Sequence, residues 1–406
     1  MFRKGTPLAI PAPQPAYVFV MMAPFHAVPY YWLRWCWAIL EILAFATTAR
    51  LIVRLTDVSA WIIWPALGIS DLYCSLILGQ FSAFCVLGIA ATAWGYSRRS
   101  QAAFACGLLL TSLEPHIAAP CYLAFLLWGR RERGITIGIA MLLLGVSLIA
   151  TSPALLYEYA FNVLPLHARS EILNQDQLSA TYALHALGVS ASTALTLANI
   201  QYCATIVIGI LVARAAEKRY GPPMLAFAPP AFAVLGGPFL HITQLCVAIP
   251  AAVFLYAERG ARRYALALWF LCIPWLNFAT ILTVLPLATA CWAAILRYAW
   301  GASARLTWGV AGVATVIEGA LAFHIAMENV TKRPDYGRIS AQDFAERTWQ
   351  VVIEQQQHSH TVAAMLAKVP SQLGLSVVLG GLVASVAWTR RHRGRRYVSA
   401  VASGAA

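Results

Sequence analysis

Basic residues in this chain gather in short clusters at alternate ends of long apolar segments. Seven such clusters hold twenty of the 29 lysine and arginine residues. They are Arg50/Arg54, Arg98/Arg99, Arg130/Arg131/Arg133, Arg214/Lys218/Arg219, Arg259/Arg262/Arg263, Arg297/Arg305 and Arg390/Arg391/Arg393/Arg395/Arg396. Because cytoplasmic loops of membrane proteins carry an excess of lysine and arginine, this pattern predicts the spans and their orientation, with the C-terminus in the cytoplasm.

The low content of charged residues supports a membrane environment. Only 11% of residues are charged and 60% are hydrophobic, whereas roughly 25% of a soluble domain is charged. The net charge of +13 lies in short loops without an aromatic–basic platform, which argues against nucleic-acid binding. The nine cysteines lie in or beside apolar segments without ligand spacing, so we predict neither disulfides nor a metal site.

The apolar segments predict an all-α polytopic transmembrane bundle with about 11–13 membrane segments. The expected spans are 30–53, 57–73, 79–96, 134–156, 194–214, 222–236, 239–257, 263–283, 285–300, 306–327 and 373–389. Two shorter helices, 101–113 and 116–128, are expected to enter and leave from the cytoplasm. They break at Glu114-Pro115, since proline lacks a backbone donor and disfavours helix at the preceding residue.

These spans divide the chain into four parts. Residues 1–28 form an external Pro-rich segment, and 29–327 form the transmembrane core with a long external loop at 157–193. Residues 328–372 form a second external loop with an amphipathic helix, and 373–406 contain the last span and a basic cytoplasmic tail. Because a chain rarely starts with an external tail of this kind, we expect a first helix upstream of Met1.

Acidic residues in apolar segments are few, and a charge inside the bilayer is costly. They are Glu41, Glu114, Glu318 and, at a helix break, Asp71. Each is a candidate functional group, and each is alternatively a structural carboxyl paired with a nearby arginine, a helix end or a buried water. For Asp71 the functional and structural interpretations are balanced.

Two further polar features are candidate ligand contacts. His241 follows a Gly236-Gly237-Pro238 break near the external face, and is either a phosphate or hydroxyl contact or a satisfied core histidine. Asn174 and Gln175 open a dense polar cluster in the 157–193 loop, which either binds sugar hydroxyls or is an ordinary hydrated loop. The chain carries no nucleotide-binding or hydrolase motif.

Several short motifs occur in the order typical of one family of membrane enzymes. They are the Tyr- and Pro-rich stretch 16–37, Leu78-Gly79-Gln80-Phe81, Gly107-Leu108-Leu109-Leu110 with Glu114-Pro115, Asn174-Gln175, and Gly237-Pro238-Phe239-Leu240-His241. Over roughly residues 10–300 this order resembles glycosyltransferase family 87, the polyprenyl-phosphate-dependent membrane glycosyltransferases typified by bacterial mannosyltransferases. Three positions differ from the family pattern: the usual asparagine near 82 is missing, glutamate replaces lysine at 114, and aspartate replaces serine at 176.

The resemblance implies a helical membrane bundle of the GT-C type in the bacterial plasma (inner) membrane. It implies hexosyl or mannosyl transfer from a polyprenyl-phosphate sugar to a lipid-linked or envelope glycan, with no cofactor or metal and with membrane lipids as partners. Gln80, Glu114, Asn174, Gln175 and His241 are then the expected substrate contacts.

The catalytic base of the family is an aspartate in the first external loop, and no Asp or Glu precedes Glu41 in this chain. We therefore expect either an N-terminally shortened chain or an inactive relative, with Asp71 as the substitute base. A secondary transporter or lipid flippase and a non-catalytic membrane scaffold are the alternatives. Neither an inverted repeat nor a ladder of buried charges supports a transporter.

Overall fold

The structure is a computed structural model that describes most residues between 14 and 271 and shorter segments after them. The described residues are 14–67, 75, 79–173, 177–259, 262–271, 293, 296–297, 301–313, 316–317, 320, 368–369, 371–384 and 386. They contain helices and one isolated β-bridge, between Gln177 and His241. The fold is therefore the predicted all-α bundle.

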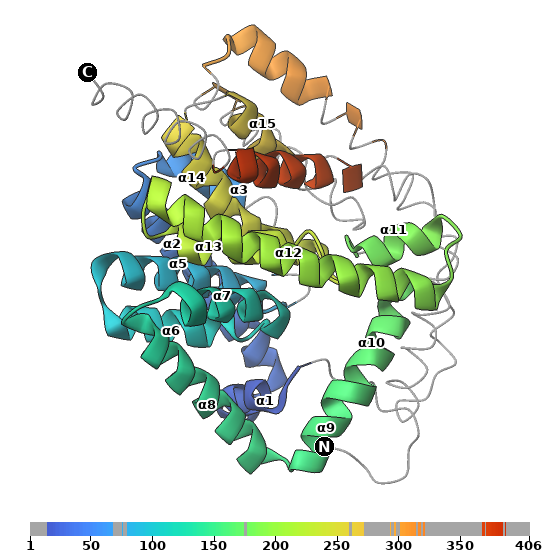
Figure 1. Cartoon of the computed structure of the whole chain (residues 1–406). Coiled ribbons are helices and arrows are strands. Elements are labelled where there is room, and N and C mark those ends of the chain that lie inside the picture. The colour runs from blue at the N-terminus through green and yellow to red at the C-terminus, as the bar shows by residue number, and fades with distance from the viewer. Residues whose placement is uncertain are drawn as a thin grey trace, which may run out of the picture.

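Short helices alternate with a few long ones (Figure 1). The α-helices are α1 (Ala16–Met22), α2 (Tyr30–Thr56), α3 (Ala60–Leu67), α5 (Ser82–Arg98), α6 (Gln101–Thr111), α7 (Pro115–Trp128), α8 (Glu132–Ala150), α9 (Pro153–Glu158), α10 (Leu164–Ser170), α11 (Ala180–Ala186), α12 (Ala191–Tyr220), α13 (Met224–Ala233), α14 (Ile249–Arg259) and α15 (Arg262–Leu271). The other elements are the 3-10 helices η1 (Ala23–Ala27), η4 (Glu171–Leu173) and η5 (Ile242–Ala248) and the π-helix η3 (Tyr159–Val163). A further apolar helix spans Ser371–Ala384.

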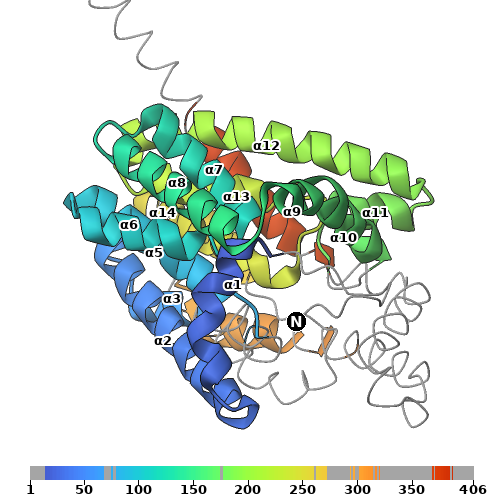
Figure 2. The ribbon, with the colours of Figure 1, turned by 90° about the horizontal axis from the view of Figure 1, so that it is seen from below.

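Three helices are long and apolar enough to cross a membrane, and they are Trp32–Thr56 within α2, α8 and α12. In Figure 2, α2 and α12 lie on opposite sides of the bundle. Their outward faces expose large apolar side chains: Trp35, Ile39 and Leu43 on α2, Met141 and Ile149 on α8, and Ile200 and Val207 on α12. Apolar surface of this extent is stable against lipid rather than water. The chain is therefore a polytopic helical membrane protein, and the larger number of 11–13 segments stays a prediction.

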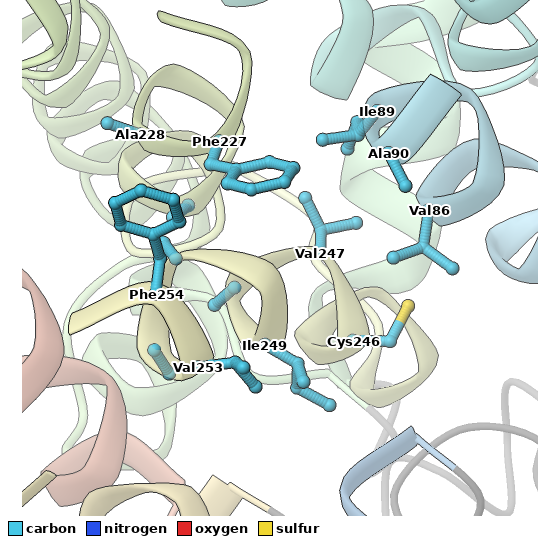
Figure 3. Packing of buried hydrophobic residues seen from close by; sticks show 14 of the residues in the cluster. Val86, Ile89, Ala90, Phe227, Ala228, Cys246, Val247, Ile249, Val253 and Phe254 are labelled. Carbon is cyan, nitrogen blue, oxygen red and sulfur yellow. The ribbon is translucent and has the colours of Figure 1, made fainter. Parts of the chain in front are cut away.

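The centre of the bundle is packed from four elements (Figure 3). Val86 and Ile89 of α5 face Phe227 of α13, and Val247 of η5 lies between them. Phe254 of α14 packs edge-on to Phe227, with ring centroids 6.3 Å apart. This core fixes the start of η5, where His241 lies.

Helices α5 and α6 pack backbone against backbone. A Cβ atom added at Gly95 would lie 2.3 Å from the nitrogen of Phe104, and one added at Gly107 would lie 2.4 Å from the nitrogen of Thr92. Glycine at such contacts lets membrane helices approach closely, so dispersion and packing hold the pair. The predicted break between α6 and α7 is also present, with Glu114 as the residue before α7 and Pro115 as its first residue.

The predicted span 134–156 is not one helix. It ends at Ala150, and α9 starts at Pro153 after Ser152, whose hydroxyl accepts a hydrogen bond from the nitrogen of Leu155 at 3.3 Å. A Ser-Pro pair is a strong helix start, because serine caps the free N–H groups and proline has none to leave unpaired. The chain therefore turns at this point instead of continuing the span.

The predicted loop 157–193 is largely helical in its described residues. Helices α9, η3 and α10 follow one another without a gap between Pro153 and Ser170 and lead toward α11 (Figure 1). This run exposes Leu155, Tyr157 and Phe161, and the two aromatic rings lie 4.6 Å apart. Sequence reasoning missed the helices because the segment is polar enough to resemble a loop, while its apolar residues lie on an outward face. The predicted external loop 328–372 lies outside the described residues except for 368–369 and 371–372, so it stays a prediction.

Candidate active site

Two residues that were predicted independently, Glu114 and His241, are joined through Gln244. The Gln244 side chain donates from Nε2 to Glu114 Oε2 at 3.2 Å, and its Oε1 accepts from the backbone nitrogen of His241 at 3.1 Å. Glu114 also holds the first turn of α7, because its carbonyl accepts from Ile117 and Ala118. The break between α6 and α7 therefore positions the start of η5 and, with it, His241.

The imidazole of His241 pairs with a second acid that the sequence analysis did not single out. His241 Nε2 lies 3.3 Å from Glu171 Oε2. The Glu171 side chain is 4% exposed, whereas that of His241 is 24% exposed. A buried carboxylate behind a more accessible imidazole can stabilise the imidazolium that forms when the ring takes a proton. This pair is the main acid–base candidate among the described residues.

Two more histidines flank the pair through the ring of Phe239. The rings of His116 and Phe239 are centred 5.6 Å apart, and those of His167 and Phe239 are centred 5.3 Å apart. Burial lowers the pKa of His167, because the charged ring would lose hydration; the nearby Glu171 opposes this effect and His241 adds to it.

The residues before His241 are tied to the segment that leads into α11. Leu178 donates from its nitrogen to the carbonyl of Leu240 at 2.7 Å, and the hydroxyl of Thr181 donates to the carbonyl of Pro238 at 2.6 Å. Together with the bridge between Gln177 and His241, these bonds form a short antiparallel pairing. They close the site on the side of α11.

Two cavities lie on either side of this pairing. One, of about 480 Å³, is bounded by α10, α12 and Phe239. The other, of about 640 Å³, lies between α11, α12 and the Ser371–Ala384 helix, and its wall is mainly apolar. At its edge the Lys368 ammonium donates to the carbonyl of Gln177 at 2.6 Å and lies 3.4 Å from the centre of the Tyr182 ring. Two separate cavities therefore border the segments that carry the site.

The site lies at the opposite end of the bundle from four of the basic clusters. Arg99, Arg130 and Arg214 line one cavity of about 540 Å³. Arg54 and Arg98 both lie over the ring of Trp94, at 5.8 and 4.8 Å. We call this the basic end. Helix α7, with 14 residues, separates it from Glu114 by about 21 Å.

The other predicted site residues are only partly accounted for. Gln80 precedes α5, which packs against η5, but within the described part of the chain Gln80 makes no hydrogen bond with the cluster. Asp71, Asn174 and Gln175 lie outside the described residues, so their roles stay predictions. Glu41 is buried in α2 and accepts from Trp37 Nε1 at 3.0 Å.

Glu171, His116, His167 and Gln244 are the site residues that sequence reasoning missed. Glu171 lies only three residues before the predicted Asn174 cluster, and His116 lies two residues after Glu114. Their closeness in sequence to predicted positions was the signal that could have identified Glu171 and His116 as site residues. Over the described ranges, no group of three His, Cys, Asp or Glu side chains is arranged to hold a metal ion.

The fold and the site therefore define a polytopic helical membrane protein with a buried acid–imidazole cluster at one end. The sequence profile of glycosyltransferase family 87 matches residues 14–238, which is more than half of the chain. The chain belongs to this family and is a membrane glycosyltransferase. The match includes Gln80 and Glu114 and ends three residues before His241, so it is narrower than the resemblance over 10–300. No curated protein and no solved structure matches the chain.

Proposed function

We propose that the protein transfers a hexosyl residue, such as mannosyl, from a polyprenyl-phosphate sugar to a lipid-linked or envelope glycan. The observation that carries this proposal is the pairing of Glu171 with the partly exposed His241 in a member of family 87. Gln177, which pairs with His241, lines one cavity, and Phe239 lines the other. No cofactor or metal takes part in the proposed reaction.

The proposed orientation follows from the basic end. Because arginine-rich loops stay in the cytoplasm, the Arg99 and Arg130 side faces the cytosol and the His241 cluster faces the outer leaflet of a bacterial plasma membrane. The same rule puts the basic C-terminal tail in the cytoplasm. Lipid-linked sugars presented at the outer leaflet would reach the cluster directly.

The proposed chemistry uses the cluster as an acid–base unit. A hydroxyl oxygen of the acceptor forms a bond to the anomeric carbon of the donor sugar as the bond from that carbon to the phosphate oxygen breaks. The electron pair of that bond leaves with the lipid phosphate, and the hydroxyl proton passes to the imidazole of His241. Glu171, at 3.3 Å, stabilises the resulting imidazolium. A positioned base of this kind contributes typically about 10²- to 10⁴-fold in rate.

Asp71 is the alternative base. It lies outside the described residues, and the sequence places it at the external end of a predicted span. The two assignments differ in what a variant does: Asp71→Asn should leave transfer intact if His241 takes the proton, and should abolish it if Asp71 does.

Labelled donors test the function directly. Membranes that contain the full chain are incubated with radiolabelled polyprenyl-phosphate mannose or glucose, and labelled lipid-linked product is measured. We expect transfer by the native chain and a loss of about 10²-fold or more in His241→Ala with normal expression. His26→Ala, which changes an exposed histidine in η1, is the matched control.

Two results would reject the proposal. If the native chain forms no product from any polyprenyl-phosphate sugar, the transferase assignment fails. If proteoliposomes instead move the intact lipid-linked sugar across the bilayer without transfer, the transporter or flippase alternative holds.

A further inference from the structure

The cavity between α10 and α12 has the composition of a binding site for an amphipathic ligand. Its volume of about 480 Å³ is within the range of small-molecule sites, roughly 300–1,000 Å³. Apolar walls come from Leu164, Leu195 and Phe239, and polar groups come from Arg169, His116 and Asn199. Such a mixture suits a ligand with both an apolar and a polar part.

Arg169 provides a cation at this cavity. Its side chain is exposed, and within the described residues its guanidinium makes no ion pair, hydrogen bond or ring contact. A guanidinium offers five N–H donors in a planar fork that matches the oxygens of a phosphate. By contrast, Arg214 at the basic end pairs with Glu217 and lies 5.5 Å from the Trp128 ring centre.

His116 adds a second donor in the same cavity. Its Nε2 is buried and has no hydrogen-bond partner among the described residues. Its Nδ1 lies 3.8 Å from Glu114 Oε2, and its side chain also interacts with Gln244. The backbone of His116 is fixed, because Tyr202 donates from its hydroxyl to the His116 carbonyl. Buried polar atoms of native proteins nearly always have a partner, so a fixed imidazole with an unpaired nitrogen points to a ligand.

The depth of the cavity matches the level of lipid phosphates. Ser192 and Thr196 of α12 line it, and Ser192 lies 22 residues before Arg214 at the basic end. At 1.5 Å per residue this separation is about 33 Å. The hydrocarbon core of a bilayer is about 30 Å thick. When Arg214 lies at one membrane surface, the cavity therefore lies at the other.

The outer wall of the cavity is also suited to lipid. Ala160, Leu164 and Arg169 line it from the continuous run of α9, η3 and α10. The same run exposes Leu155, Tyr157 and Phe161, so it can lie in the membrane surface with this apolar face among the acyl chains. A lipid in that leaflet is therefore adjacent to the cavity.

We propose that Arg169 and His116 bind the phosphate group of the polyprenyl-phosphate lipid in this cavity, an assignment that rests on the proposed function for the identity of the lipid. The phosphate then lies next to Phe239, whose ring centre is 5.3 Å from that of His167. The prenyl chain leaves past Leu164 and Leu195 toward the membrane.

Direct binding tests this assignment without relying on turnover. The purified full chain in detergent is titrated with farnesyl phosphate, farnesol or inorganic phosphate, and binding is followed by intrinsic tryptophan fluorescence. We expect saturable binding of farnesyl phosphate. The dissociation constants of farnesol and of inorganic phosphate should each be at least about tenfold higher than that of farnesyl phosphate. Arg169→Gln should raise the dissociation constant for farnesyl phosphate about tenfold or more, since bonds to charged groups are the strong ones. Arg130→Gln, an exposed arginine at the basic end, should leave it unchanged.

The outcomes separate the two proposals. If Arg169→Gln binds farnesyl phosphate as tightly as the native chain, the phosphate site is elsewhere, even when sugar transfer is observed. If inorganic phosphate binds as tightly as farnesyl phosphate, the site takes free phosphate and the lipid assignment fails. If Arg169-dependent binding is found but no donor supports transfer, the site stands and the transferase proposal fails. An equal melting temperature for both variants and the native chain shows that each variant is folded.

Discussion

The two ends of the bundle hold ionisable side chains in different environments. At the basic end Arg99, Arg130 and Arg131 are exposed. At the other end Glu114 and Glu171 are buried, and each is linked to an imidazole or an amide. Exposed charges cost little, whereas buried charges are stable only when they are paired. The first end fits the predicted membrane orientation, and the second fits the proposed acid–base role.

The largest effect is expected from a substitution that forces α5 and α6 apart, because the contact between these two helices supports both ends of the bundle. Gly95→Leu introduces a side chain where a Cβ would already lie 2.3 Å from the nitrogen of Phe104. Overpacking costs typically about 1–3 kcal/mol, and rigid backbone atoms cannot yield, so we expect loss of folded protein. The yield of monodisperse protein in detergent measures this. Gly138→Leu on α8, where nothing lies within 4 Å, is the control and should fold normally. Equal yields would show that the helices do not depend on backbone contact.

The second test compares one acid from each end. Glu171→Gln removes the negative charge beside His241, so the imidazolium loses its partner and we expect transfer to fall about 10²-fold. Glu132→Gln, at the cavity of the basic end, should leave the transfer rate unchanged. Initial rates with a labelled polyprenyl-phosphate sugar measure both. A similar loss in the two variants would mean that the ends do not differ in function.

A smaller effect on stability is expected at Glu114. Glu114→Ala leaves the amide of Gln244 buried without its acceptor, which costs about 1–3 kcal/mol. Glu114→Gln retains an oxygen that accepts this bond and should cost less. Thermal unfolding in detergent gives the two melting temperatures. The expected order is native, then Gln, then Ala, and a Gln variant less stable than the Ala variant would contradict the hydrogen-bonding role.

The smallest effect is expected for an arginine at the basic end. Arg130→Gln changes an exposed side chain, so the free energy of unfolding should stay within about 0.5 kcal/mol of the native value. The same melting experiment and transfer assay measure it. A large loss in either would show that the basic end is more than a topological signal.

Local signals predicted much of the fold. The break at Glu114-Pro115 and the helices on either side of it were predictable because proline restricts the backbone of its neighbours. The turn at Ser152-Pro153 carries the same signal, but the long apolar stretch around it concealed the turn. The helical run from α9 to α10 was not predictable from periodicity, because its apolar residues face outward instead of into a core.

The candidate site was predictable only in part, because its residues meet across long stretches of chain. Glu114 and His241 were identified as an unusual acid in an apolar segment and as a histidine after a Gly-Gly-Pro break. Their connection through Gln244, 130 residues from Glu114, has no local signature. The pairing of Glu171 with His241, 70 residues apart, likewise depends on tertiary packing alone.

These separations also determine when each part can form during synthesis. Cys85 and Thr111, which contact each other across α5 and α6, are only 26 residues apart, so this hairpin can pack soon after it leaves the ribosome. The hydrogen bond between Thr181 and Pro238 can form only after 57 further residues have been synthesised. The bond between Lys368 and Gln177 can form only after 191 further residues. Because chains emerge from the N-terminus at a finite rate, the helical scaffold is assembled first. The cavity beside α10 is lined by residues up to Phe239, whereas the cavity beside α11 is completed only after Lys368 and the Ser371–Ala384 helix have been translated.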